Sequence, residues 1–388
     1  MASTESSRSL NSLDTGQSSF IYWLLRINKG LQPIKAYQYV GIYLLTCIII
    51  YGIGFVWAAG SNPSLLIKFP GLKGSYLNDV NLMFIVFITL PVSLCLHLQE
   101  RNFIPSCLER LTTNGVLCEP KISLNQFIVL WEKRFKISNW VIQFLGVIIV
   151  LIVIKLNYKS MVDDPTGWQH YGAPKDNITY LGWFNIIFQI SLVFFIISQV
   201  LLRIPIVTWL LWSLRNSFTI KVRPLHPDGV GGLEAVARIA LQGQLVLAML
   251  GINIASIIMS YYFHDNSQPW YIVTAGVIAY VIIAPIVFLG PLLPFRKPMK
   301  REKEKLLSSI SSEFDQELND IGNLLQSSDS IKRLEKIEKI TRLNKSISRF
   351  PEWPSDMSTL RKFFVTLLVP AISALISTIV ELIIKGIK

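Results

Sequence analysis

Charged residues are scarce in this chain. Only 16% of its 388 residues are Asp, Glu, Lys or Arg, against about 25% in a typical soluble domain. At the same time 51% are hydrophobic, and the mean hydropathy is +0.45. This composition excludes an ordinary water-soluble protein and indicates a membrane protein.

The residue types that most often carry chemistry are also few. The chain has four cysteines, four histidines and no C-x-x-C pair, which argues against zinc sites and disulfide frameworks. It contains neither H-E-x-x-H nor G-x-S-x-G, and neither of the common glycine-rich nucleotide motifs. We therefore expect no enzymatic activity, no metal, no cofactor and no specific contact with nucleic acid.

Long apolar runs are abundant. A helix needs about 20 apolar residues to cross about 30 Å of hydrocarbon, and seven stretches meet this requirement with only Lys155 and Glu381 charged inside them. These predicted spans are 39–59, 81–98, 137–156, 181–202, 239–263, 271–294 and 363–384. The expected fold class is all-α, a multi-pass helical membrane protein in the lipid bilayer with about seven spans.

The basic residues predict the orientation. Lys and Arg concentrate in the cytoplasmic loops of membrane proteins. With the N-terminus inside, the inner segments hold 30 bases and 19 acids, net +11, and the outer ones 7 bases and 6 acids, net +1. We therefore expect a cytoplasmic N-terminus. Seven spans place the C-terminus outside, but a re-entrant or interfacial segment at 363–384 leaves both ends inside.

The N-terminal part, residues 1–38, is expected to lie outside the six-span bundle of residues 39–295. Its first 19 residues are rich in serine and have no apolar run, which predicts a disordered tail. The following FIYWLLRI, residues 20–27, predicts a short helix at the membrane interface, where aromatic residues are favoured.

Two spans are expected to continue on the cytoplasmic side. The amphipathic segment 127–135 runs into the third span and predicts a helical extension of it. After the fourth span, Arg203 and Pro205 interrupt a second apolar run, 204–214. A helix continuing through this run is longer than the hydrocarbon is thick, so we expect it to tilt, to kink at Pro205 or to be buried against protein.

A third cytoplasmic segment, 296–362, precedes the last span and tail, 363–388. Hydrophobic residues recur in it at steps of three and four on both sides of a polar break at 327–330, which predicts a helical hairpin or coiled-coil pair. Its apolar stripes pack either against the protein's own helices or against other copies in a homo-oligomer.

The most unusual segment is 221–238, KVRPLHPDGVGGLEAVAR. Pro-Asp-Gly predicts a tight turn, and two glycines then precede a helix start with an acid in its first turn. The backbone N–H groups at such a start can hold an anionic cytoplasmic ligand, but a turn with only local bonds, or a metal at the His-x-Asp pair, also fits. The candidate residues of this ligand or gating turn are Arg223, His226, Asp228, Gly229, Gly231, Gly232 and Glu234.

The segment HPDGVGGL, residues 226–233, resembles an HPDG-x-GGL stretch in uncharacterised bacterial multi-pass membrane proteins. The resemblance is confined to this segment and the basic, proline-containing residues before it. It implies a bacterial inner membrane and no particular activity.

Two predicted spans have a polar face. In the last span, five residues share one face at spacings of three and four, and these pore-lining candidates are Thr366, Pro370, Ser373, Ser377 and Glu381. The same small residues also suit close helix packing, and the acid suits a proton or substrate relay. A weaker polar face in the fifth span consists of Gln242, Asn253, Ser256 and Ser260.

These features favour an oligomeric channel or pore, gated from the cytoplasmic side. The polar face of the last span supplies a lining, the hairpin an assembly element and the glycine-rich turn a control surface. In a bacterium, such a pore would suit a defence effector that depolarises the membrane. The alternatives are a secondary transporter and a membrane signalling or scaffold protein that binds a cytoplasmic partner.

Overall fold

A computed structural model describes most of the chain. The described residues are 36–61, 66, 75–118, 121–163, 168–170, 178–224, 226–264, 270–323 and 330–368. The predicted tail and interfacial helix lie outside them, apart from residues 36–38, of which 36 begins the first described helix.

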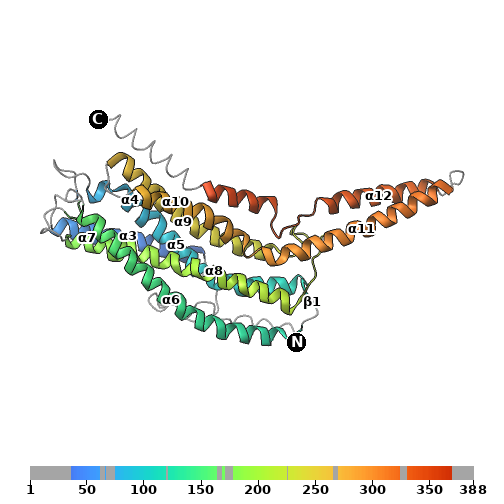
Figure 1. Cartoon of the computed structure of the whole chain (residues 1–388), viewed down its shortest axis with the longest axis horizontal. Helices are drawn as coiled ribbons and strands as arrows, with labels where there is room; N and C mark the ends of the chain where they lie inside the picture. The colour runs from blue at the N-terminus through green and yellow to red at the C-terminus, as the bar shows by residue number, and fades with distance from the viewer. Residues whose placement is uncertain are drawn as a thin grey trace.

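The described part is helical except for one pair of two-residue strands, so the all-α prediction is confirmed in substance (Figure 1). The elements of the membrane part are α3 (Ala36–Ser61), η2 (Tyr76–Asn78), α4 (Val80–Met83), η3 (Phe84–Thr89), α5 (Leu90–Thr113), α6 (Leu124–Val162), α7 (Tyr180–Phe184), η4 (Asn185–Ile190), α8 (Ser191–Ser217), α9 (Glu234–His264) and α10 (Trp270–Leu289). The remaining elements are β1 (Leu117–Cys118), β2 (Thr219–Ile220), α11 (Leu293–Asn323) and α12 (Ser330–Ser348).

Six of the predicted spans coincide with helices. Five helical stretches are long and apolar enough to cross a membrane, and α10 with α11 forms a sixth that is bent by 50°. The chain is therefore a multi-pass helical membrane protein. The seventh predicted span, 363–384, continues beyond the described residues, so the count of seven stays a prediction.

The spans form a centre and a periphery. More than half of the residues are buried in the spans built on α5, α8 and α9, whereas fewer than a fifth are buried in α3 and α6. The outward side of α6 exposes large apolar side chains, among them Ile137, Trp140 and Phe144. Because water does not favour such a surface, this side of α6 suits contact with lipid.

The second span changes its helical winding at Pro91. Because proline has no N–H, it cannot donate to the carbonyl four residues back, and the preceding turn, η3, is a π-helix. Two donors from α3 reach the carbonyls of this region: the Tyr43 hydroxyl donates to the Phe87 carbonyl (2.5 Å), and the Cys47 thiol to that of Val86 (3.8 Å). The irregular turn thus holds α3 against the centre.

The helices α5, α6, α8 and α9 share a second hydrophobic core at the end of the bundle that carries the strands, with Trp131, Leu211 and Phe295 among its buried members. The predicted extension 127–135 is confirmed as part of α6, and α8 continues past Pro205 to Ser217. Of the outcomes expected for the run 204–214, burial against protein is the one found. Beside this core, β1 pairs with β2 in antiparallel register.

The helices α11 and α12 form an antiparallel pair that projects from the bundle (Figure 1), and we call this pair the stalk. Ile310, Ile340 and Ile347 are buried in its seam. The predicted hairpin segment, 296–362, contains most of this pair, although α11 starts earlier, at Leu293. Residues 357–368 form a further helix, whose start Asp356 caps by accepting from the Thr359 N–H (2.9 Å).

The contact between Tyr43 and the π-helical turn can be tested in a mutant cycle. Tyr43→Phe removes the donor to the Phe87 carbonyl, and we expect a loss of about 1 kcal/mol in unfolding free energy. In a Pro91→Ala background a backbone N–H becomes available to the helix, so the same change should cost less. Equilibrium unfolding in detergent measures both costs.

The control is Tyr37→Phe, because Tyr37 lies on the same helix and is 67% exposed. It should leave the stability unchanged. Equal costs of Tyr43→Phe in the two backgrounds would contradict the assignment.

Candidate functional site at the base of the stalk

The glycine turn, residues 226–233, is organised around Asp228. Its Oδ1 accepts hydrogen bonds from the backbone N–H groups of Val230 (3.1 Å) and Gly232 (3.0 Å), and its Oδ2 accepts one from Glu234 (3.3 Å). Asp228 thereby caps the start of α9. The anion at this helix start is a side chain of the chain itself, and an external anion would have to displace it.

The surroundings of Asp228 favour its charged form. Burial on its own raises the pKa of this carboxyl, but hydrogen bonds from Gly232, Val230, His226 and Glu234 together hold the pKa below its usual value. The Nδ1 atom of His226 lies 2.9 Å from Oδ1 of Asp228 and also accepts from the Asp228 N–H (3.3 Å). No group of three potential metal-ligating side chains occurs within the described residues.

Two of the glycines are required by close packing as well as by the backbone. Gly231 has a φ of +73°, and a Cβ on it would lie 2.3 Å from Val222 Cγ1 and 3.0 Å from Phe350 Cζ. Gly232 has a φ of +91°, and a Cβ there would lie 2.6 Å from Val116 Cγ2. Gly229 has a similar φ of +69° but has open space around it. Any other residue is strained at all three positions, and at Gly231 and Gly232 it also collides.

The base of the stalk touches this turn. Phe350, two residues beyond the end of α12, lies against Gly231 and is buried. Nearby, the Arg296 guanidinium of α11 lies 4.6 Å from the ring centre of Trp353, and Lys303 pairs with Glu352 (3.7 Å). The segment that leaves the stalk is therefore held against both α11 and the turn.

The other predicted turn residues lie around this contact. The Arg223 N–H donates to the Gly231 carbonyl (3.2 Å), and its guanidinium lies over Gly115. Glu234 forms an ion pair with Arg238, one turn later on α9 (2.7 Å). All seven predicted residues of the turn are thus close in space, and they join the ends of α5, α8 and α9.

The polar face predicted for the fifth span is directed at neighbouring helices. Gln242 donates to the Leu96 carbonyl on α5 (2.9 Å), Ser256 donates to Asn81 Oδ1 on α4 (2.5 Å), and Asn253 donates to the Met249 carbonyl of its own helix (3.0 Å). The side chain of Ser260 lies outside the described part. These contacts agree with packing between helices.

Only Thr366 of the predicted pore-lining residues is described. It is 7% exposed, and its carbonyl accepts from the Tyr280 hydroxyl on α10 (3.2 Å). Phe364 and Val365 beside it are exposed, so Thr366 is on the side of its helix that faces the bundle. Pro370, Ser373, Ser377 and Glu381 lie outside the described residues.

A buried polar cluster inside the bundle was missed by the sequence analysis. Arg203 on α8 is 1% exposed and donates to Asn139 Oδ1 on α6 (3.2 Å). His97 on α5 is fully buried and interacts electrostatically with the Arg203 charge. The signal was a single arginine in the long apolar run 181–214, which we had interpreted as the end of the span. A buried charge within a membrane bundle usually marks a functional position.

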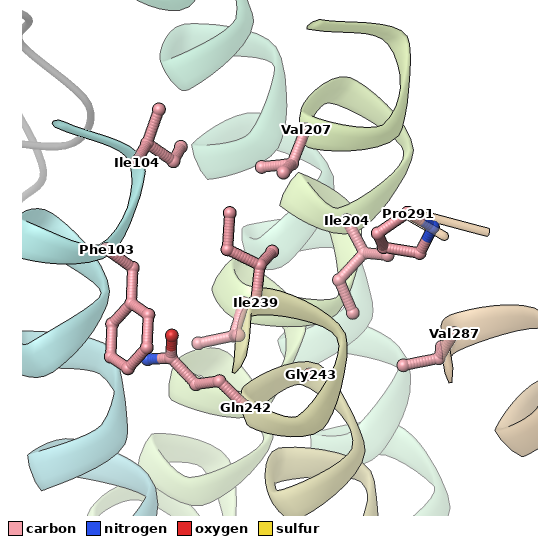
Figure 2. Close-up of a pocket in the computed structure, with 10 residues that line it drawn as sticks. Phe103, Ile104, Ile204, Val207, Ile239, Gln242, Gly243, Val287 and Pro291 are labelled. Atoms are coloured by element: carbon pink, nitrogen blue, oxygen red, sulfur yellow. The ribbon is translucent and has the colours of Figure 1, made fainter. Parts of the chain in front are cut away.

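A small cavity lies between α5, α8, α9 and α10 (Figure 2). Its volume is about 30 Å³, room for a single water molecule. Gln242 is the polar residue of its lining, and Pro291, in the bend between α10 and α11, also contributes (Figure 2). The cavity thus reaches the point where the stalk joins the membrane part.

Comparisons of the chain with protein-family models, with curated proteins and with solved structures find no match.

The role of Asp228 predicts a stability that depends on pH. Asp228→Asn should lower the unfolding free energy by about 2 kcal/mol at pH 7, because the bonds to a charged acceptor are weakened. Since the folded pKa is depressed, this contribution is complete above the unfolded value of about 4 and is lost as the pH falls through the folded pKa. Thermal unfolding from pH 7 to pH 3 should therefore show the two proteins converging at low pH.

Asp315→Asn on the exposed side of the stalk is the matched control. It should change the stability by less than about 0.5 kcal/mol. A difference between wild type and Asp228→Asn that persists unchanged to pH 3 would rule out the carboxylate as the source.

Proposed function

We propose that the chain forms an oligomeric membrane channel whose opening is controlled from the stalk. The observation that carries this proposal is the double connection of the stalk to the membrane part. One connection is covalent and runs through α10, and the other is the packing of Phe350 on the glycine turn. A movement of the stalk therefore acts on two spans at once.

The covalent connection is a bend between two helices. The break between α10 and α11 spans residues 290–292, and the axes differ by 50°. A Cβ on Gly290 would lie 2.8 Å from the Ile286 carbonyl oxygen, so glycine permits this close turn of the backbone. The cavity beside Pro291 leaves adjacent space that a change in the bend can use.

The second connection leads to α9. Phe350 contacts Gly231, and Asp228 ties the turn to the first turn of α9. Because α9 is one of the central, mostly buried spans, a displacement of Phe350 is transmitted to the middle of the bundle. This arrangement supports gating from the stalk side.

The conducting path is proposed to lie between copies. Buried side chains fill the space between α5, α8 and α9, where the cavity beside Gln242 holds only about one water molecule. The polar residues Ser373, Ser377 and Glu381 of the last predicted span are the proposed lining. With the orientation predicted from the charges, the stalk is cytoplasmic, and opening depolarises the membrane, which suits a defence role in a bacterium.

The buried cluster of Arg203, Asn139 and His97 favours a second candidate function, a transporter with a path inside the bundle. The π-helical turns η3 and η4 interrupt two spans near this interior, and interrupted spans are typical of transporters. Flux without discrete single-channel currents would favour this candidate over the channel.

Gating from the stalk predicts different effects for two neighbouring glycines. Gly231→Ala introduces a Cβ against Phe350 and Val222, so we expect a changed open probability with unchanged single-channel conductance. Gly229→Ala has a similar backbone strain but meets no neighbour, and it serves as the control. Recordings from purified protein in planar bilayers measure both quantities.

Equal open probabilities in the two variants would show that the stalk contact does not gate the channel. A changed conductance in Gly231→Ala would place the turn in the conducting path itself.

The proposed lining is tested separately. Ser377→Leu should reduce the single-channel conductance because an apolar side chain replaces a hydroxyl, and Glu381→Ala should reduce the selectivity for cations because a negative charge is removed. Unaltered currents in both variants would move the pore to another span. A monomeric protein without current would overturn the channel proposal.

A further inference from the structure

The two helices of the stalk carry opposite charge. Residues 306–323 of α11 contain four acids and no base, net −4, whereas α12 contains six bases and two acids, net +4. Within the stalk, Lys336 on α12 pairs with Glu317 on α11. The remaining charges are available to act outside the pair.

The antiparallel pairing fixes which residues lie level with each other. Because Lys336 is level with Glu317, Lys339 is level with Phe314 and therefore adjacent in height to Glu313. Glu313 and Lys339 are both exposed. Each helix thus presents one of two opposite charges at the same height.

One side of the stalk combines these charges with an exposed leucine. Glu313 and Leu343 each follow a buried isoleucine, Ile310 or Ile340, by three residues. In an antiparallel pair the same offset leads to the same side of the seam. Lys339 is four residues before Leu343 and shares its side. Leu343 is 46% exposed, so this side, which we call the charged face, has an apolar residue to bury.

We infer that the charged face binds the same face of a second copy of the chain. A two-fold axis along the stalk places α11 of one copy beside α12 of the other at the same level. Glu313 of each copy then meets Lys339 of the other, and both Leu343 side chains are covered. Such paired charges choose the partner and the register more than they add affinity.

This inference rests on the proposed function in one respect, that several copies stand in one membrane with their stalks on the same side. It adds the surface through which they meet. A pair of copies buries a charged face completely, and in a larger ring the same α11 to α12 contact joins each copy to the next.

The experiment uses full-length protein with two different tags, co-expressed and solubilised in mild detergent. Glu313→Lys alone or Lys339→Glu alone places like charges at the contact, and we expect co-purification of the two tags to fall by about tenfold. Mixing the two variants restores opposite charges at both contacts. Co-purification of this mixed pair should return to the wild-type level.

Two controls make the same charge changes on the other side of the seam. Asp315→Lys and Lys345→Glu each follow the buried isoleucine by five residues, and both positions are exposed. They should leave co-purification unchanged. Circular dichroism checks that each variant keeps its helix content.

The inference is overturned if Glu313→Lys has no more effect than Asp315→Lys, or if the mixed pair fails to recover. A loss in Lys339→Glu and Lys345→Glu alike, with none in Glu313→Lys, would instead assign α12 to an anionic surface such as lipid vesicles. If all variants conduct like the wild type and still co-purify, the channel stands and this contact falls. Recovery of the mixed pair without any current would leave the contact and remove the channel.

Discussion

The carboxylate of Asp228 is the interaction on which the inner end of the molecule depends. It binds three backbone N–H groups that a glycine-rich loop would otherwise leave without a partner beside the start of α9. Because the loop is closed in this way, Gly231 and Gly232 come close enough for Phe350 and Val116 to pack on them. The ends of α5 and of the stalk are thus positioned by one side chain on α9's approach.

A related constraint acts inside the membrane part. Hydrocarbon offers no hydrogen bonds, so a backbone carbonyl that loses its helical donor must find one within the protein. Pro91 creates this need, and α3 answers it with the hydroxyl of Tyr43 and the thiol of Cys47. The same requirement explains why Gln242 and Ser256 bond to adjacent helices.

The apolar runs and the periodicity of the stalk sequence could be read without a structure, because span length and helical repeat are local properties. The Pro-Asp-Gly turn was equally local. Two features were not local. Arg203 was interpreted as the end of a span because its partner Asn139 lies on another helix, and the contact between Phe350 and Gly231 joins residues far apart in the chain. No periodicity or motif links such pairs.

The bend at residues 290–292 has a mechanical consequence. With 31 residues and a rise of 1.5 Å per residue, α11 is an arm of about 46 Å, so each degree of rotation at the bend moves its far end by about 0.8 Å. Conversely, a weak force at the far end produces a large torque on α10. A protein or lipid that displaces the tip by a few ångströms therefore needs to turn the bend by only about five degrees, and the membrane part can respond to a contact made far outside it.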